Sequence, residues 1–262
     1  MSAPPRILII AGSDSSGGAG IQADIKTVTM LGGYAMTAIT AITAQNTTGV
    51  QGVQTMPASF VGDQIESCLS DIGADAIKIG MLGSPAVAHK VADRLAPLDI
   101  PIVFDPVMVA TSGSMLADPE TVAGFARLMD LATIVTPNLP ELEALTGKDC
   151  PDRDAIYRAT AELAAAHDCH VLAKGGHAEG DRIVDLLVRP DGSAISFDHA
   201  RIETRHTHGT GCTLSSAIAT LLGHGQSVEH AVRLARKFVF KAIQAAPGFG
   251  AGHGPMGHQG VR

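Results

Sequence analysis

The sequence of 262 residues is 45% hydrophobic and contains 29 glycines, which is enough chain for one large α/β domain with a substantial core. Its 26 Asp and Glu residues outnumber its 19 Lys and Arg residues, the formal net charge is −7, and tryptophan is absent. This composition predicts neither a basic groove nor a base-stacking surface, so we expect no nucleic-acid partner. The apolar segments are shorter than a membrane span, and the N-terminal one lacks the features of a signal peptide. We therefore expect a cytoplasmic protein with no membrane partner.

The first predicted element is a buried strand over residues 7–11, which leads into a glycine-rich loop over residues 12–20. This loop matches neither the phosphate-binding P-loop nor the dinucleotide-binding glycine pattern. A helix follows, and its apolar stripe consists of Ile21, Ile25, Val28 and Leu31. Asp24 lies off that stripe, where its carboxylate could bind a substrate hydroxyl or amine. A solvated surface Asp is the alternative.

Helix and strand signals then alternate along the chain. Helix starts are predicted at Pro57, Ser84-Pro85, Asp118-Pro119 and Asn138, the last helix ending at Gly147. Short buried strands are predicted over residues 76–79, 102–104, 133–135 and 170–173. Residues 183–188 and 193–197, joined by a turn, predict an antiparallel hairpin at one sheet edge. The economical interpretation is one three-layer αβα domain over residues 1–262, with a mostly parallel sheet.

Glycine and polar residues follow the ends of successive predicted strands. The carboxyl ends of parallel strands meet at one edge of a sheet, and ligands bind there. The residues at these positions are Gly12, Gln45, Met81, Asp105, Asn138, Glu141 and Lys174. We therefore expect a single ligand site formed by several loops.

Residues 206–212 form a glycine turn that opens a helix and places Cys212 in the first turn. The unpaired N–H groups and the helix dipole can bind a phosphate there, and the same field lowers the pKa of a thiol. Gly209, Thr210 and Gly211 are therefore candidates to hold phosphate, and Cys212 is a candidate base. A tight turn without function is the alternative.

Phosphoryl transfer requires a metal ion, positive charge and an oriented acceptor. Glu141 and Asp105 offer oxygen ligands that suit Mg²⁺, directly or through water. Glu141 could equally cap its helix, and Asp105 could be a turn residue before Pro106. Lys174 would hold nucleotide phosphate as a point charge, or it could lie on the surface.

Six ordered motifs together resemble the hydroxymethylpyrimidine kinase/phosphomethylpyrimidine kinase family of thiamine biosynthesis, in the ribokinase-like superfamily. They span about residues 6–257 and are residues 12–24, 44–47, 105–109, 136–141, 174–177 and 207–212. The resemblance implies an αβα fold, ATP as phosphoryl donor, Mg²⁺ and a homodimer. It also implies two successive phosphorylations, of 4-amino-5-hydroxymethyl-2-methylpyrimidine and of its monophosphate.

The resemblance also implies roles for individual residues. Asn138 and Glu141 would act on the metal, with Asn138 also close to the nucleotide, and Gln45 and Asp24 would contact the pyrimidine. Met81 and the backbone near Val107 would line the substrate pocket. By its chemistry alone, Gln45 has both a carbonyl and an amide, which complement an aminopyrimidine edge, although it could simply stabilise a loop.

Two other functions stay open. A pyridoxal kinase of the same subfamily shares the glycine loops, but residues 44–46 and 109–113 lack the cysteine that such kinases carry on their lid. A catalytically silent pyrimidine-binding protein on this scaffold is the other alternative. The retained Cys212, Asn138 and Lys174 favour an enzyme.

The remaining cysteine and histidine motifs suggest structural roles. The four cysteines, Cys68, Cys150, Cys169 and Cys212, form no Cys-x-x-Cys pair and are expected to be reduced thiols. Cys68 is predicted to lie in the core, and residues 167–170 are not favoured as a metal site. The glycine-rich tail over residues 248–258 is predicted to be flexible or loosely docked, with no metal site at its histidines.

Overall fold

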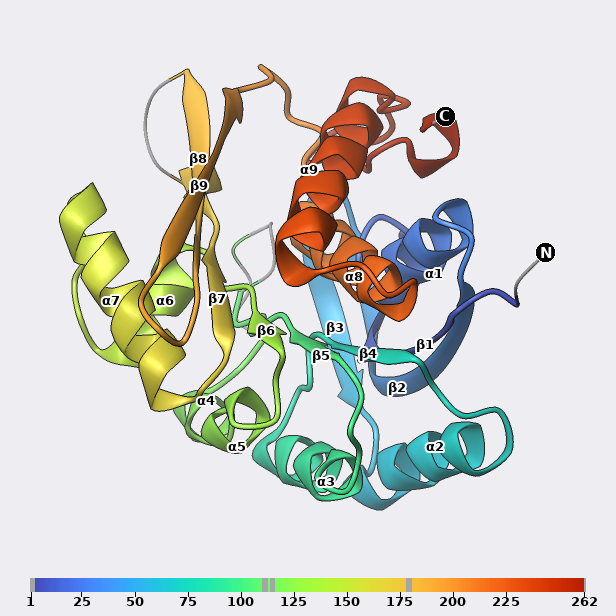
Figure 1. Cartoon of the computed structure of the whole chain (residues 1–262). Helices are drawn as coiled ribbons and strands as arrows, with labels where there is room; N and C mark the ends of the chain where they lie inside the picture. The colour runs from blue at the N-terminus through green and yellow to red at the C-terminus, as the bar shows by residue number, and fades with distance from the viewer. Residues whose placement is uncertain (1–2, 110–112, 114–115, 178–180, 262) are drawn as a thin grey trace.

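The computed structural model describes residues 3–109, 113, 116–177 and 181–261. These residues form one sheet of nine strands in the order β3-β2-β1-β4-β5-β6-β7-β8-β9 (Figure 1). The strands are β1 (Arg6–Asp14), β2 (Tyr34–Asn46), β3 (Gly49–Thr55), β4 (Ala76–Ile79), β5 (Ile102–Phe104), β6 (Ile134–Val135), β7 (His170–Ala173), β8 (Arg182–Val188) and β9 (Ala194–Ala200).

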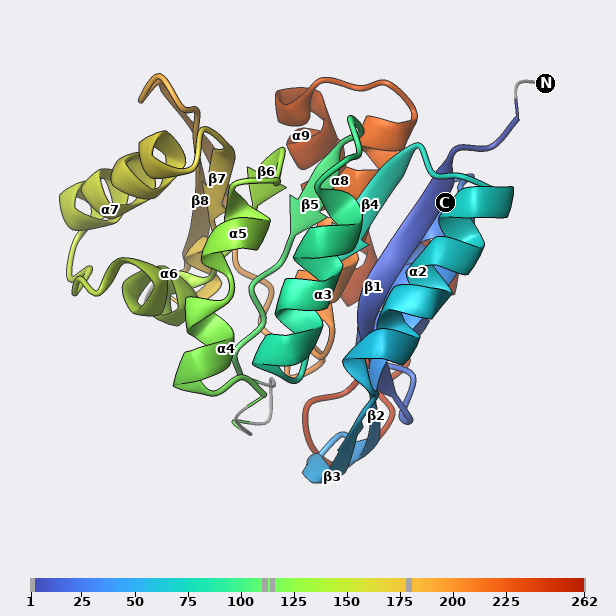
Figure 2. The ribbon, with the colours of Figure 1, turned by 90° about the horizontal axis from the view of Figure 1, so that it is seen from below.

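Helices cover both faces of the sheet, as Figures 1 and 2 show. One face carries α1 (Gly20–Met30), α8 (Thr210–Gly223) and α9 (Val228–Gln244). The other face carries α2 (Ala58–Asp71), α3 (Pro85–Leu95), α4 (Pro119–Ala123), α5 (Ala126–Met129), α6 (Leu139–Thr146) and α7 (Arg153–Ala166). Strand β1 serves both layers because its side chains alternate: Ile7 and Ile9 pack toward α8, whereas Leu8 and Ile10 pack toward α2 and α3. This arrangement confirms the predicted three-layer αβα class.

The centre of the sheet is parallel and its two edges are antiparallel. The ladders β2-β1-β4-β5-β6-β7 are parallel, which aligns their carboxyl ends. The predicted hairpin β8–β9 is antiparallel, as expected. Strand β3, which pairs antiparallel with β2, was not predicted. Its side chains are mostly exposed, so the sequence lacks the apolar alternation that marks a half-buried strand.

The predicted helix boundaries are confirmed by cap contacts. The side chains of Ser84 and Asp118 accept hydrogen bonds from the N–H groups of residues 87 and 121, at 3.3 and 2.8 Å. Gly147 ends α6 in the left-handed conformation, with φ of 67°. The helix expected after Asp118 differs, because it breaks around Gly124 into α4 and α5. No helix in the described part of the chain is long and apolar enough to cross a membrane.

The C-terminal tail is docked, so the prediction of a flexible or loosely docked tail is wrong. The N–H of His253 donates to the carbonyl of Thr47 at 2.8 Å, and His258 Nε2 lies 2.8 Å from Thr213 Oγ1 in the first turn of α8. Burial lowers the pKa of His258 to about 4, so its imidazole is neutral. Glycine allows the close approach, since a Cβ at Gly252 would lie 2.1 Å from the carbonyl oxygen of Thr47.

Candidate active site

A cavity of about 1570 Å³ opens at the carboxyl ends of the parallel strands. Its lining comes from the loops after β1, β2, β4, β5, β6 and β7 and from the start of α8. The predicted site residues in this lining are Gly12, Gln45, Met81, Asp105, Val107, Asn138, Glu141, Lys174, Gly209, Thr210, Gly211 and Cys212. The structure therefore brings together every predicted site residue except Asp24.

Asp24 lies behind the cavity wall, so it is not the substrate-facing carboxylate that we expected. Its side chain is fully buried, pairs with Lys78 Nζ at 2.9 Å and accepts a hydrogen bond from Ser216 Oγ at 2.6 Å. Lys78, on β4, does line the cavity. Burial alone would lower the pKa of Lys78, but the carboxylates of Asp24 and Asp105 outweigh that effect and raise it. Lys78 is therefore a buried cation near the site, which the sequence analysis did not identify.

The start of α8 forms one wall of the cavity. Gly209 caps the helix with φ of 84°, a left-handed conformation that favours glycine. A Cβ on Gly209 would also lie 2.0 Å from the carbonyl oxygen of Gly18, so this turn packs closely on the loop after β1. A Cβ on Gly211 would lie 3.4 Å from Lys174 Nζ. The first-turn N–H groups, which have no partners within the helix, therefore lie close to a lysine, as an anion site requires.

Lys174 links two carboxylates on the opposite wall. Its Nζ lies 2.9 Å from Asp105 Oδ1 and 3.8 Å from Glu141 Oε2. Asp105, which is 1% exposed, also accepts a hydrogen bond from Thr136 Oγ1 at 3.0 Å. Burial raises the pKa of Asp105, but Lys174 and Lys78 outweigh it, so the pKa is lowered and the side chain is ionised.

Glu141 both caps its helix and lines the cavity, so the two interpretations of this residue are compatible. Its Oε2 accepts from the N–H of Asn138 at 2.8 Å, and Asn138 Oδ1 accepts from the N–H of Glu141 at 2.9 Å, which is a capping box. Burial raises the pKa of Glu141 to about 7, and the charge of Lys174 only partly offsets the effect. This buried carboxylate would be stabilised by a further cation.

The thiol of Cys212 differs from our expectation of a lowered pKa. Burial raises the pKa of Cys212 to about 11, and the positive charge of Lys78 only partly opposes this. The thiol is thus protonated at neutral pH when no substrate is bound. The sequence reveals the helix start but not the depth at which the sulfur lies.

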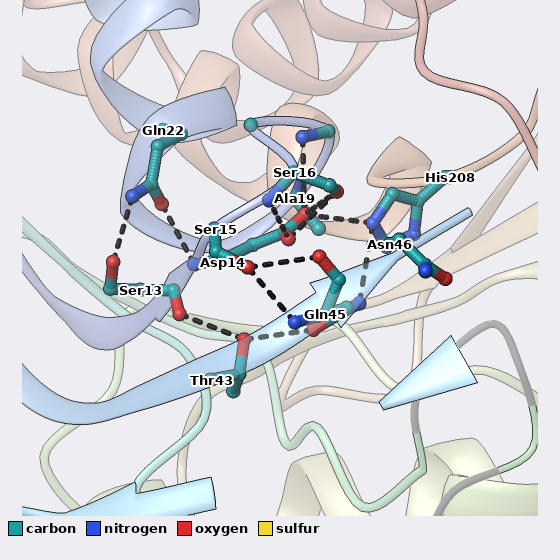
Figure 3. A network of polar contacts seen from close by, with 12 residues as sticks. Ser13, Asp14, Ser15, Ser16, Ala19, Gln22, Thr43, Gln45, Asn46 and His208 are labelled. Carbon is teal, nitrogen blue, oxygen red and sulfur yellow. Dashed lines mark hydrogen bonds and ion pairs between the residues drawn. The ribbon is translucent and has the colours of Figure 1, made fainter. Parts of the chain in front are cut away.

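A polar network that the sequence analysis missed connects the loop after β1 to β2 and α8 (Figure 3). Asp14 and His208 are 3% and 4% exposed, and Asp14 Oδ2 lies 2.8 Å from His208 Nε2. The same imidazole nitrogen lies 3.3 Å from the side-chain amide of Gln45. Burial raises the pKa of Asp14, but hydrogen bonds from His208 and Ser16 outweigh it and hold the pKa at about 2. Asp14 and His208 lie within two of the six motifs. Their position beside the glycines is the sequence feature that could have identified them.

The cavity also has an apolar wall that was not predicted. Val239 and Ile243 of α9 line it, together with residues of the β8–β9 hairpin. Here Asp185 accepts from the N–H of Gly175 at 2.7 Å and from Arg236 Nε at 2.6 Å, which fixes the loop after Lys174. Helix α9 itself was not predicted from the sequence. An apolar wall can contact a flat aromatic base, and Lys174 lines the same cavity.

The remaining cysteines and His167 take no part in the cavity chemistry described above. Cys68 packs against the core, and Cys150 and Cys169 are buried. His167 Nδ1 lies 2.6 Å from Asp130 Oδ1. Within the described ranges, no three His, Cys, Asp or Glu side chains gather as a metal site.

Comparison with known proteins identifies the family. The phosphomethylpyrimidine kinase family matches residues 14–257. The chain belongs to this family. It is accordingly a kinase, and the resemblance found in the six motifs is confirmed.

Relatives match along nearly the whole chain. The hydroxymethylpyrimidine/phosphomethylpyrimidine kinase of Streptomyces coelicolor is 48% identical over 257 residues, covering 97% of this chain and 94% of its own. The enzyme of the same name from Rhizobium meliloti is 45% identical over 255 residues and covers 96% of each chain. The thiamine biosynthesis multifunctional protein of Corynebacterium efficiens is 42% identical over 99% of this chain. This chain spans only 36% of that protein.

Solved structures of two kinds of kinase share the fold. An ADP complex of Bacillus subtilis pyridoxal kinase superposes with a TM-score of 0.91 at 33% identity, covering 99% of both chains. The phosphomethylpyrimidine kinase of Clostridium difficile superposes with a TM-score of 0.80 at 41% identity, covering 91% of this chain and 99% of its own. The pyridoxal kinase has the higher TM-score, whereas the phosphomethylpyrimidine kinase has the higher sequence identity. The fold is therefore ribokinase-like in either case, and side chains must distinguish their acceptors.

Proposed function

We propose that this protein uses ATP to phosphorylate the hydroxymethyl group of 4-amino-5-hydroxymethyl-2-methylpyrimidine and then phosphorylates the monophosphate to the diphosphate, for thiamine diphosphate biosynthesis. The observation that carries this proposal is the shared cavity, which Gln45 lines together with Lys174 and the start of α8, where Lys174 Nζ lies close to Gly211. The names of the relatives from Streptomyces coelicolor and Rhizobium meliloti support the acceptor.

The donor phosphates would bind between α8 and Lys174. The N–H groups of Gly211 and Cys212 and the hydroxyl of Thr210, at the start of α8, would stabilise charge that develops on the transferred group. Lys174 adds a fixed positive charge, and Asn138 lies next to it on the same wall. The apolar wall formed by Val239 and Ile243 would contact the nucleotide base. Structural neighbours with bound nucleotides, pyridoxal kinase of Bacillus subtilis with ADP and that of Staphylococcus aureus with AMP-PCP and pyridoxal, support a nucleotide site in this fold.

The residues present fit a magnesium ion. Asp105 and Glu141 supply two carboxylates near the phosphate position, and the pKa of about 7 for Glu141 indicates a carboxylate that an added cation would stabilise. Nucleotide phosphate oxygens and water would complete the shell. When bound, Mg²⁺ would neutralise charge on the phosphates. The ion itself stays a prediction.

The acceptor would bind in the part of the cavity that Gln45 lines. Gln45 presents one amide to the pyrimidine edge, and Met81 and Val107 give apolar contact to the ring. Cys212 lies at the start of α8, where its sulfur can take the hydroxyl proton as the phosphate–oxygen bond forms. Because its pKa is about 11, this proton transfer draws on a small thiolate fraction that the cation of Lys78 favours.

Pyridoxal phosphorylation is the second candidate. It is favoured by the TM-scores of 0.91 and 0.90 with pyridoxal kinases of Bacillus subtilis and Staphylococcus aureus. Residues 44–46 and 109–113 carry no cysteine, which disfavours a pyridoxal kinase by sequence. Residues 110–112 lie outside the described residues, so this difference is known from the sequence alone.

Substitution of Gln45 tests the acceptor assignment. We expect Gln45→Ala to reduce kcat/KM for the pyrimidine alcohol by about 1–3 kcal/mol of transition-state stabilisation, because buried polar partners lose a hydrogen bond. The KM for ATP should stay unchanged. A fall in ATP affinity with unchanged preference between pyrimidine and pyridoxal would refute the assignment. Any product from the wild-type protein would rule out a silent binding protein.

Two further expectations remain predictions. A homodimer, which the family resemblance implies, can be tested by light scattering on the purified protein. A cytoplasmic location can be tested by fractionation of the source cell. Neither changes the residues assigned above.

A further inference from the structure

The contacts around Gln45 constrain the orientation of its side-chain amide. Asp14 is held in one position by N–H groups of the loop after β1, those of Ser16 at 2.8 Å, Gly18 at 3.1 Å and Ala19 at 2.8 Å. The carboxylate is ionised and can only accept hydrogen bonds. Its contact with His208 Nε2 at 2.8 Å therefore requires a proton on that nitrogen.

That proton decides which atom of Gln45 lies beside His208. The amide group of Gln45 approaches the same Nε2 at 3.3 Å (Figure 3). An amide nitrogen there would set one N–H against another, whereas an amide oxygen would share the Nε2 proton with Asp14. The two orientations of an amide are distinguished by their hydrogen-bond partners, and here the oxygen satisfies the contact.

The other end of the amide agrees with this orientation. Thr43 Oγ1 lies 3.0 Å from the carbonyl oxygen of Ser13 and 3.1 Å from the far atom of the Gln45 amide. A hydroxyl has one proton, and a carbonyl oxygen can only accept, so Thr43 satisfies both contacts by donating to Ser13 and accepting from an N–H of Gln45. The amide nitrogen therefore belongs beside Thr43.

The backbone of this region leaves the amide little other freedom. Gln45 N donates to Ser15 Oγ at 2.9 Å, and Ser15 Oγ donates back to the Gln45 carbonyl at 2.9 Å. His208 is likewise fixed, because its backbone N–H donates to the carbonyl of Gly254 at 3.2 Å and its imidazole ring packs against Gly18. The orientation of one amide is thus controlled by two loops that are held together.

We propose that His208 is a specificity-determining positioning residue, whose Nε2–H, held by Asp14, fixes the Gln45 amide with its oxygen toward His208 and its nitrogen toward Thr43. One N–H and one oxygen lone pair of Gln45 are then left for the acceptor, in a fixed order. An acceptor must place its ring nitrogen and its amino group in the matching order. Pyridoxal lacks a ring nitrogen beside an amino group and cannot satisfy both. This inference rests on the proposed contact between Gln45 and the pyrimidine.

A double-mutant cycle tests the coupling between the two side chains. The variants are His208→Leu, Gln45→Ala and their combination, assayed as full-length protein for kcat/KM with the pyrimidine alcohol and with pyridoxal. We expect His208→Leu alone to lower kcat/KM for the pyrimidine about tenfold, with the KM for ATP unchanged and pyridoxal use little affected. In the Gln45→Ala background the same change should cost less than about twofold.

Conservative variants keep the test valid if His208→Leu is poorly folded. His208→Gln places an N–H donor near the position of Nε2 and should recover most of the pyrimidine activity, whereas Thr43→Val should lower it in the same direction as His208→Leu. Equal losses from His208→Leu with and without Gln45, or no recovery by His208→Gln, would overturn the proposal. If Gln45→Ala itself has no effect on pyrimidine use, the proposed acceptor contact is wrong, and the result separates that failure from a failure of the coupling.

Discussion

At the scale of single residues, the buried pair of Lys78 and Asp24 shows how charge is kept beside the site. Both side chains are 0% exposed, and their contact at 2.9 Å joins β4 to α1. A buried ion pair adds little over apolar packing, but losing one partner leaves an uncompensated charge. The apolar stripe of α1 does not reveal this pairing, because the partner lies 54 residues away, on a strand that is buried throughout.

Lys78→Met should therefore destabilise the fold by about 3–5 kcal/mol, which urea denaturation followed by circular dichroism measures. The double variant Lys78→Met with Asp24→Leu is the control and should recover much of that loss, because it buries no unpaired charge. A single-variant loss below about 1 kcal/mol would show that the carboxyl of Asp24 is neutral without its partner.

Cys212 gives a pH-dependent prediction. With a thiol pKa of about 11, the thiolate fraction rises about tenfold for each pH unit below that value. If the thiolate takes the proton of the alcohol, kcat/KM for the first phosphorylation should increase from pH 7 to pH 9. Cys212→Ala should remove this increase.

The two phosphorylations provide the internal control for Cys212. A phosphomonoester has a second pKa near 6 and is already anionic, so it needs no base. Cys212→Ala should slow the alcohol step by about 10²–10⁴-fold, less if proton transfer is late, and the monophosphate step far less. Equal losses in both steps would identify Cys212 as a packing or phosphate-loop residue.

Glu141 can be tested without destroying its cap. Glu141→Gln keeps an oxygen that accepts from the N–H of Asn138 but removes the negative charge. The Mg²⁺ concentration for half activity should rise, and excess Mg²⁺ should partly restore the rate. Glu143→Gln on the same helix, outside the cavity lining, is the matched control. Unchanged metal dependence with a lower thermal midpoint would assign Glu141 to helix capping alone.

At the scale of elements, the tail supports the site from outside. Residues 245–261 contact Thr47 after β2 and Thr213 in α8, the two segments that carry Gln45 and Cys212. Gly252→Ala would place a Cβ 2.1 Å from the Thr47 carbonyl and should lower stability by about 1–3 kcal/mol in thermal unfolding. Gly49→Ala, whose Cβ would have no neighbour nearer than 3.8 Å, is the control. Similar midpoints for both variants would show that the tail docks loosely.

Local sequence signals predicted most elements correctly, and long-range contacts account for two of the features that were missed. The caps at Ser84, Asp118 and Asn138 are hydrogen bonds between residues three apart, so a short stretch of sequence is enough to predict them. Strand β3 and the docked tail owe their structure to backbone contacts with distant segments, which composition does not reveal. The site residues at strand ends followed from topology, whereas the burial of Asp24 and Cys212 depended on packing depth.

At the scale of the whole molecule, the fold fixes a phosphoryl-transfer site but not the acceptor. The same architecture serves pyridoxal kinase at a TM-score of 0.91 and phosphomethylpyrimidine kinase at 0.80. The acceptor must therefore be decided by the side chains around Gln45 and by direct assay.

The most direct measurement is mass analysis of the products formed from ATP and Mg²⁺ with the pyrimidine alcohol, its monophosphate and pyridoxal present together at equal concentration. We predict that the pyrimidine monophosphate and then the diphosphate accumulate, with phosphorylated pyridoxal as a minor product. Preferential formation of pyridoxal phosphate, or the absence of any pyrimidine diphosphate, would contradict the proposed function.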